Sequence, residues 1–130
     1  MEEMSRDSAV KSPPLAAPSL CAIFHEASEL IGRRWTGAII FVLLKRRLRF
    51  AELRDCIPAI TDRMLSERLQ ELEQEGIVVR TVVPETPVRV EYSLSDKGRA
   101  LAKPIDAIAA WAHDWMEPLP KAKPKRPARG

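Results

Sequence analysis

Two helical patterns lie close together between residues 50 and 75, and their spacing constrains the fold more than any other feature of the sequence. Apolar side chains recur at helical spacing in both segments. Pro58 ends the first segment, because the residue before a proline disfavours helical backbone angles. Helices joined by so short a turn must cross sharply, so the pattern predicts a helix-turn-helix. The apolar positions are Phe50, Leu53 and Ile57 in the first helix and Leu65, Leu69 and Leu72 in the second.

The second of these helices and the segment after it have clear boundary signals. Thr61 is a suitable N-cap residue, and Gly76 supplies a C-terminal stop. Residues 78–83 and 88–94 are β-branched or alternate in polarity on either side of the sequence Pro-Glu-Thr-Pro. This arrangement predicts an antiparallel hairpin with a proline-bearing loop.

Three further helices complete the predicted fold. Apolar spacing predicts a first amphipathic helix over 20–31, and the apolar run 35–44, flanked by charge, predicts a buried central helix. Ser95 is expected to cap a last helix that extends to Met116 and that Pro104 bends. The sequence therefore predicts a mainly α fold with a small β-hairpin: a winged helix-turn-helix with extra N- and C-terminal helices.

The chain has the size of one globular domain, with 130 residues of which 45% are hydrophobic and 30% charged. Residues 1–19 are polar and contain prolines, which predicts a flexible N-terminal arm. The domain itself is expected to span residues 20–116. Residues 117–130 predict a basic disordered tail, which either follows DNA phosphates or serves as a solubilising end.

Positive charge is concentrated rather than spread along the chain. The last ten residues hold five of the 21 Lys and Arg and no acid, so residues 1–120 carry 16 bases against 18 acids, a net charge of −2. Between Arg33 and Arg68, however, nine bases stand against four acids. A local positive field on a nearly neutral body is typical of a protein that docks one face on phosphates.

Several other classes of protein find no support in the sequence. No apolar run approaches the roughly 20 residues of a membrane span, and the acidic N-terminus differs from a secretory signal. We therefore expect a cytoplasmic protein without membrane contact. His25, His113 and Cys21 lack the spacing of a metal site, and catalytic and phosphate-loop motifs are missing. We expect no metal, no cofactor and no enzymatic activity.

The N-terminal turns of the second helix of the helix-turn-helix are the candidate surface for contacting DNA bases. Side chains opposite the leucine face can reach base edges from there. Arg63 suits a bidentate contact with guanine, and Thr61 suits a phosphate contact. The alternative is an ordinary solvated helix face with a routine cap. The candidates are Thr61, Asp62, Arg63, Ser66 and Glu67.

Three arginines outside this helix are candidate contacts with the DNA backbone. Arg89 lies where the hairpin loop enters its second strand and is the natural wing contact. Arg47 and Arg49 precede the first helix of the helix-turn-helix. An exposed arginine is more often a solvated charge, but as a set the three would position the second helix in a groove.

Several stretches together resemble the HxlR-type family of winged helix-turn-helix transcriptional regulators, which are related to MarR regulators. The resemblance covers about Cys21 to Trp115 and includes the late Trp111. It implies a sequence-specific regulator that acts as a homodimer on a double-stranded DNA operator with two-fold symmetry. The matching stretches are "LIGRRW", "RFAEL", "IPAITDRMLSERLQELEQEGIV" and "VEYSLSDKG".

The resemblance to this family also implies that the first and last helices form the dimer contact. Their apolar bulk exceeds what a small three-helix core needs, in agreement with that role. The same residues are alternatively ordinary core, or the wall of a pocket for a small-molecule effector. The candidate residues are Phe24, Ile108, Trp111 and Trp115.

Two cysteines are candidates for redox sensing. Cys21 stands where the family often carries an N-terminal cysteine, although Ala22 replaces the usual following proline, and some relatives sense oxidants or electrophiles through that cysteine. It also precedes a helix N-terminus, which favours a thiolate. Cys56 is a candidate second thiol, but its position three residues after Leu53 favours a buried small hydrophobe.

A rival interpretation keeps the fold and changes the partner. In this reading the winged helix is a protein-interaction module whose charged face binds an acidic protein without specific DNA binding. A clear preference for one DNA sequence over random DNA would separate the two interpretations.

Overall fold

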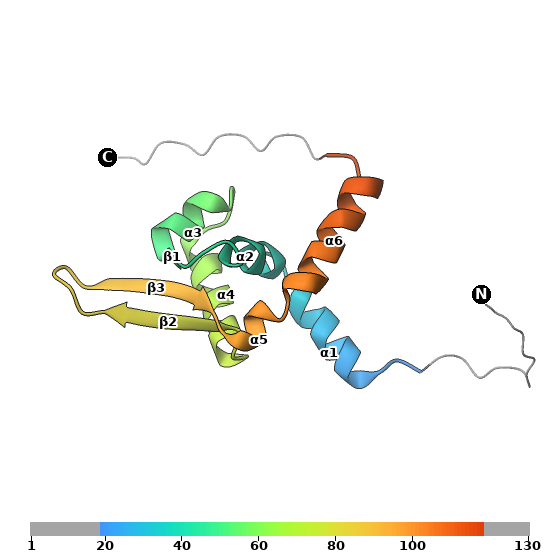
Figure 1. The fold of residues 1–130 in the computed structure, drawn as a ribbon, viewed down its shortest axis with the longest axis horizontal. Helices are drawn as coiled ribbons and strands as arrows, with labels where there is room; N and C mark the ends of the chain where they lie inside the picture. The colour runs from blue at the N-terminus through green and yellow to red at the C-terminus, as the bar shows by residue number, and fades with distance from the viewer. Residues whose placement is uncertain (1–18, 119–130) are drawn as a thin grey trace, which may run out of the picture. The chain divides into compact units, whose positions relative to one another are not determined.

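The computed structural model describes residues 19–118, so most of the predicted arm (1–19) and tail (117–130) lies outside the described residues. The chain divides after Leu30 into two units, and α1 lies almost wholly in the first. The larger unit holds every later element (Figure 1). In order, the elements are α1 (Ala22–Ile31), α2 (Thr36–Leu43), β1 (Leu48–Arg49), α3 (Phe50–Cys56), α4 (Asp62–Gln74), β2 (Val78–Val83), β3 (Arg89–Leu94), α5 (Asp96–Arg99) and α6 (Ala102–Trp115).

The predicted helix-turn-helix is confirmed as α3 and α4. The hydroxyl oxygen of Thr61 accepts a hydrogen bond from the Met64 backbone N–H at 3.1 Å, so Thr61 caps α4 as expected. Gly76 follows the helix with a φ of 76°, a left-handed conformation that glycine adopts without steric cost. The three leucines of α4 are at most 1% exposed, so this helix is anchored along its whole apolar face.

The central helix α2 is buried on one face rather than all round. Ile39, Ile40 and Leu43 are at most 2% exposed and form the core with the leucines of α4. Phe41 is 41% exposed, and the Lys45 ammonium lies 4.9 Å from the centre of its ring. The expectation of a wholly buried helix is therefore wrong for Phe41, whose ring is covered in part by a neighbouring cation.

The sheet has three antiparallel strands in the order β1-β3-β2, one more than the predicted hairpin. The hairpin pairs Val78 with Leu94 at its base and Val83 with Arg89 at its end. The added strand β1 pairs Leu48 with Tyr92 and Arg49 with Glu91. Two residues are too few to show an alternating pattern, which is why the sequence did not reveal β1. The β2–β3 hairpin projects beyond the helices of its unit (Figure 1) and forms the wing, which we define as residues 78–94.

The predicted last helix is wrong in one respect, because it consists of two helices. Ser95 caps the short α5, its hydroxyl oxygen accepting from the Gly98 N–H at 3.1 Å. The helix ends at Arg99, and α6 begins at Ala102. Pro104 therefore lies in the first turn of α6, where its missing N–H is not needed, and the break comes before it. A side chain at Gly98 would collide with the carbonyl oxygen of Ile77, which explains the close packing of α5 on the start of the hairpin.

Candidate nucleic-acid interface

The N-terminal turns of α4 present the predicted reading residues to solvent. The Arg63 side chain is 88% exposed, and Thr61, Asp62 and Ser66 are exposed as well. Glu67, one turn after Arg63, is half-buried. Thus the predicted residues do lie on one accessible end of the helix, opposite its leucines.

Arg63 and Glu67 form an ion pair along this face. The Arg63 Nε atom donates to Glu67 Oε2 at 3.1 Å, in the i,i+4 geometry that helices favour. This contact does not use the terminal nitrogens of the guanidinium. Those nitrogens are the ones that a bidentate contact with a guanine edge requires.

Asp62 has a structural contact that the sequence analysis did not predict. Arg54 of α3 donates from Nη1 to both carboxylate oxygens of Asp62, each at 3.2 Å. The pair joins the last turn of α3 to the first turn of α4. Asp62 therefore helps to fix the crossing of the two helices, in addition to its predicted place at the interface.

Arg68 supports the site from beneath, and sequence reasoning missed it. It is only 9% exposed, and its Nε donates to the backbone oxygen of Arg34 at 2.8 Å. Its Nη1 donates to Glu71 at 3.2 Å, and Glu71 also binds Arg33 at 3.0 Å. The cluster fastens α4 to the loop before α2. Its signal was present in the sequence, since Arg68 lies one turn after Leu65 and one turn before Leu72 on the buried face.

In the wing, Arg89 is held by two carboxylates. Its Nη1 and Nη2 atoms donate to the two carboxylate oxygens of Glu85 at 2.7 and 3.2 Å. Its Nε donates to Glu91 at 2.9 Å, and Arg47 donates to the other oxygen of Glu91 at 3.4 Å. The predicted backbone contacts Arg47 and Arg89 are thus linked through one acid.

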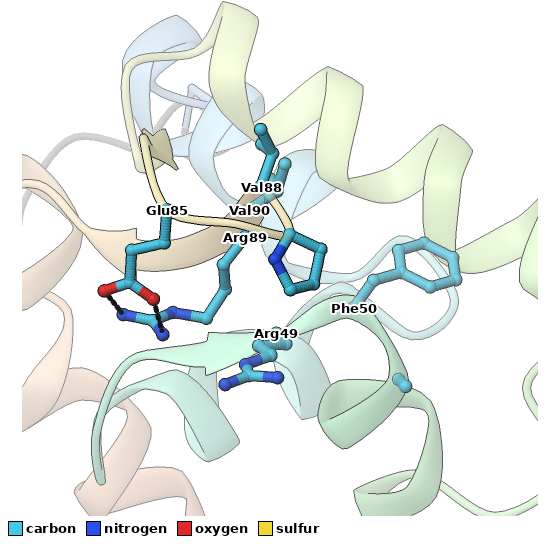
Figure 2. Close-up of a pocket in the computed structure, with 8 residues that line it drawn as sticks. Arg49, Phe50, Glu85, Val88, Arg89 and Val90 are labelled. Atoms are coloured by element: carbon cyan, nitrogen blue, oxygen red, sulfur yellow. Dashed lines mark hydrogen bonds and ion pairs between the residues drawn. The ribbon is translucent and has the colours of Figure 1, made fainter.

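A pocket of about 370 Å³ lies beside this cluster. Figure 2 shows the Glu85 carboxylate facing the Arg89 guanidinium, with Arg49 beneath the pair. Phe50 and the loop residues Pro87 and Val88 supply apolar walls. Two of the three predicted backbone arginines therefore share one pocket, with an acid already bound to one of them.

Glu52 secures the start of α3. Its Oε1 atom accepts a hydrogen bond from the Arg49 backbone N–H at 2.8 Å, and Arg46 lies 3.7 Å from its other oxygen. The Arg49 N–H and, to a smaller degree, the positive charges of Arg46 and Arg49 hold the pKa of Glu52 below its ordinary value of 4.5. The interaction orients the chain where Arg49 enters the pocket.

Both cysteines are free and exposed. Cys21 immediately precedes α1, and its carbonyl accepts the helical hydrogen bond from the His25 N–H at 2.9 Å. Cys56 is the last residue of α3, and the expectation that it is buried is wrong. Leu53 and Ile57 occupy the core side of this segment, which turns Cys56 toward solvent.

The residues predicted for a dimer or ligand site are strongly exposed within their own units. On α1, Phe24 is 62% exposed; on α6, Ile108, Trp111 and Trp115 are 54, 57 and 77% exposed. They are therefore not core. A pocket of about 440 Å³ on α6 is lined by Ala109, Ala112, His113, Met116, Glu117 and Pro118, and by none of the four predicted residues.

Two further features are absent from the described part of the chain. Among residues 19–118, no group of three or more His, Cys, Asp or Glu side chains is arranged to hold a metal ion. Over the same residues, the helices are too short or too polar for any of them to cross a membrane.

Comparison with known proteins matches this chain to regulators throughout its helix-turn-helix and wing. The model of the HxlR-like helix-turn-helix family matches residues 30–120. The uncharacterised transcriptional regulator YvaP of Bacillus subtilis is 48% identical over 99 residues, which cover 76% of this chain and 92% of YvaP. The regulator YodB of the same organism is 47% identical over 100 residues, covering 77% of this chain and 89% of YodB.

Solved structures give the same result for the fold. The reduced form of YodB superposes with a TM-score of 0.69 at 46% identity, covering 78% of this chain and all of YodB. YodB has also been solved after diamide treatment and with quinone bound. The redox regulator HypR in its oxidised form superposes with a TM-score of 0.70 at 34% identity, covering 74% of this chain and 99% of HypR. The predicted winged helix-turn-helix is thereby confirmed, and the chain belongs to the HxlR-like helix-turn-helix family of transcriptional regulators, which are not enzymes.

Proposed function

We propose that this chain is a homodimeric, sequence-specific DNA-binding regulator that acts on an operator with two-fold symmetry. The observation that carries the proposal is the N-terminal end of α4, where an 88% exposed arginine stands on a helix anchored by fully buried leucines. A rigid helix with an exposed reading end is what insertion into a major groove requires. The DNA target implies that the protein acts in the cytoplasm.

The side chains at this end have distinct proposed roles. Arg63 contacts a guanine edge through its terminal nitrogens, while Glu67 orients it through Nε. The Thr61 oxygen accepts the capping hydrogen bond, so its hydroxyl proton is available to a phosphate. Asp62, Ser66 and Glu67 flank the same groove. Arg47, Arg49 and Arg89 hold the neighbouring backbone.

Dimerisation is supported by the apolar faces of α1 and α6. Each helix by itself exposes large apolar side chains, including Ile23 at 79% and Trp115 at 77%, which a monomer in water would leave unburied. Pairing these helices with those of a second copy would bury them. In such a dimer we expect the two α4 helices to lie about one DNA turn apart, roughly 34 Å, as a symmetric operator needs.

The proposed signal is an oxidant or electrophile that reacts with Cys21. Its thiol is exposed immediately before α1, which is one of the two proposed dimer helices. The relative YodB has reduced, diamide-treated and quinone-bound forms, and HypR is a redox regulator, which supports a thiol signal here by similarity. Cys56, exposed at the end of α3, is the second candidate thiol. A small molecule bound at the aromatic helices is the alternative signal.

The test is a fluorescence-anisotropy titration of the full chain on DNA upstream of its own gene and on scrambled DNA. The wild type should prefer the upstream DNA, and Arg63→Ala should lose about 1–3 kcal/mol of that preference while its dimer persists. Arg99→Ala on α5 is the control for removing one positive charge. Equal binding to both DNAs would refute the proposal and favour the protein-interaction module.

The same titration tests the signal. Diamide should weaken operator binding by the wild type, and Cys21→Ser should remove that response. Cys56→Ser serves as the matched control, since it removes the other exposed thiol. An unchanged response in the Cys21→Ser protein would rule out Cys21 as the sensor.

A further inference from the structure

The wing arginine is already paired in the free protein. Its two terminal nitrogens face the two oxygens of Glu85 in a fork-to-fork arrangement at 2.7 and 3.2 Å (Figure 2). A phosphate binds arginine through the same two parallel N–H groups. A DNA phosphate and the Glu85 carboxylate therefore compete for one binding position on Arg89.

The two acids that hold Arg89 differ in how firmly they are themselves held. Glu91 lies on β3, its side chain is 17% exposed, and it pairs across the sheet with Thr81 and Arg49. Glu85 lies in the loop between β2 and β3, and its side chain is 52% exposed. Glu91 is thus a fixed support for the arginine, whereas Glu85 can turn into solvent without disturbing the sheet.

A displaced carboxylate leaves a suitable site behind. The pocket of about 370 Å³ beside the pair is lined by both Arg49 and Arg89, so a phosphate that enters it meets two guanidinium-bearing residues. Once Glu85 has left, the acid nearest to Arg89 is Glu91, which keeps the arginine extended along β3 through Nε. Arg49 and Arg89 supply the positive charge that a contact with a backbone phosphate of DNA requires.

We propose that Glu85 is an intramolecular competitor of the DNA backbone. In the free protein its carboxylate occupies the position on Arg89 where a DNA phosphate would bind, and it must be displaced before the wing can bind DNA. This inference rests on the proposed DNA-binding function and assigns a residue that regulates it. Contact with any DNA has to overcome the Glu85–Arg89 pair. The cost of breaking this pair is the same for operator and scrambled DNA, so it lowers the affinity for both by the same factor.

The test is a double-mutant cycle with Glu85→Gln and Arg89→Ala, titrated on the upstream DNA and on scrambled DNA. Glu85→Gln should tighten binding to both DNAs by roughly three- to tenfold, the range expected for releasing a partly exposed bidentate pair. In the Arg89→Ala background the same substitution should change affinity by less than about twofold. Glu75→Gln, which removes the same charge at the far end of α4, is the control and should leave affinity unchanged.

Two results would overturn the inference. If Glu85→Gln has no effect, the carboxylate does not compete; if its gain persists without Arg89, it acts only by general repulsion of DNA. Because Arg89→Ala also removes one of the two arginines that bind Glu91, Arg89→Lys repeats the cycle with the charge kept and the fork removed, and it should likewise abolish most of the gain. Wild-type binding without operator preference would refute the proposed function alone, whereas no wild-type binding to any DNA would refute both.

Discussion

Arg63 on α4 and Arg89 in the wing are both predicted to contact DNA, yet the fold holds them in opposite ways. Arg63 is 88% exposed and uses only Nε in its pair with Glu67. Arg89 is 27% exposed, and all three of its nitrogens are bound to carboxylates. The contrast suggests a division of labour. Arg63 on α4 has its terminal nitrogens free of the Glu67 contact and so available to a base edge. Arg89 in the wing becomes available to DNA only when Glu85 is displaced.

The largest expected effect is on stability, because α4 and the wing differ in how deeply their side chains are buried. Leu65→Ala should cost about 2–5 kcal/mol of unfolding free energy, because the side chain is fully buried on the core face of α4. Val82→Ala on the wing, where the side chain is 51% exposed, should change stability by less than about 0.5 kcal/mol. Urea denaturation of both variants measures the difference. Similar losses would show that the wing is packed as firmly as the helix.

Exchanging arginine for lysine sharpens the functional side of the comparison. Arg63→Lys keeps the charge but loses the bidentate fork, so operator preference should fall by about 1–3 kcal/mol while scrambled DNA is bound as before. Arg89→Lys should instead change binding to both DNAs alike, because a backbone contact carries no sequence information. Anisotropy titrations on the two DNAs distinguish these patterns. A loss of preference in the Arg89→Lys protein would mean that the wing reads bases.

The cap of α4 gives a smaller effect. Thr61→Ala should destabilise the fold by about 1 kcal/mol, since it removes the acceptor for the Met64 N–H. Thr61→Ser keeps that oxygen and should recover most of the loss. Thermal unfolding followed by circular dichroism measures both variants. If Thr61→Ala weakens DNA binding and Thr61→Ser restores it, the hydroxyl also serves a phosphate, as proposed.

The smallest effect concerns pH and the start of α3. The pKa of Glu52 lies below its ordinary value of 4.5, so the folded state favours the ionised carboxylate. Its contribution to stability is therefore complete above about pH 4.5 and is lost as the pH falls through the lowered pKa of the folded protein. The stability difference between the wild type and Glu52→Gln should shrink over that acidic range. A difference that does not change with pH would show that the Glu52 contact does not depend on charge.

The sequence predicted the regular parts of the larger unit well, because periodicity and capping residues are local signals. The leucines of α4, the Thr61 cap and the hairpin followed directly from them. The missed features depend on contacts between distant residues. Strand β1 exists only through its pairing with β3. Arg68 can be buried only because the Arg34 carbonyl oxygen and the Glu71 carboxylate accept its hydrogen bonds.

The candidate site shows the same division. Exposure of Arg63 and its neighbours follows from helical geometry, so their position was predictable. The pairing of Arg89 with Glu85 was not, because it depends on how a proline-bearing loop folds back on its own strand. Cys56 was misplaced for a simpler reason. A residue three positions after Leu53 lies on the core side only if the helix continues, and α3 ends at Cys56. Ile57, the next residue, packs into the core instead.

Strand β1 ends at Arg49 and helix α3 begins at Phe50, so sheet and helix-turn-helix share a single peptide bond with no connecting loop. A protein with a hinge at this point could vary the distance between its wing and its recognition helix to suit different duplexes. Here the backbone fixes that distance, so the DNA must change its shape to contact both the wing and the helix. We therefore expect operators of this regulator to be distinguished partly by how readily they bend or narrow their minor groove, at base pairs that no side chain touches.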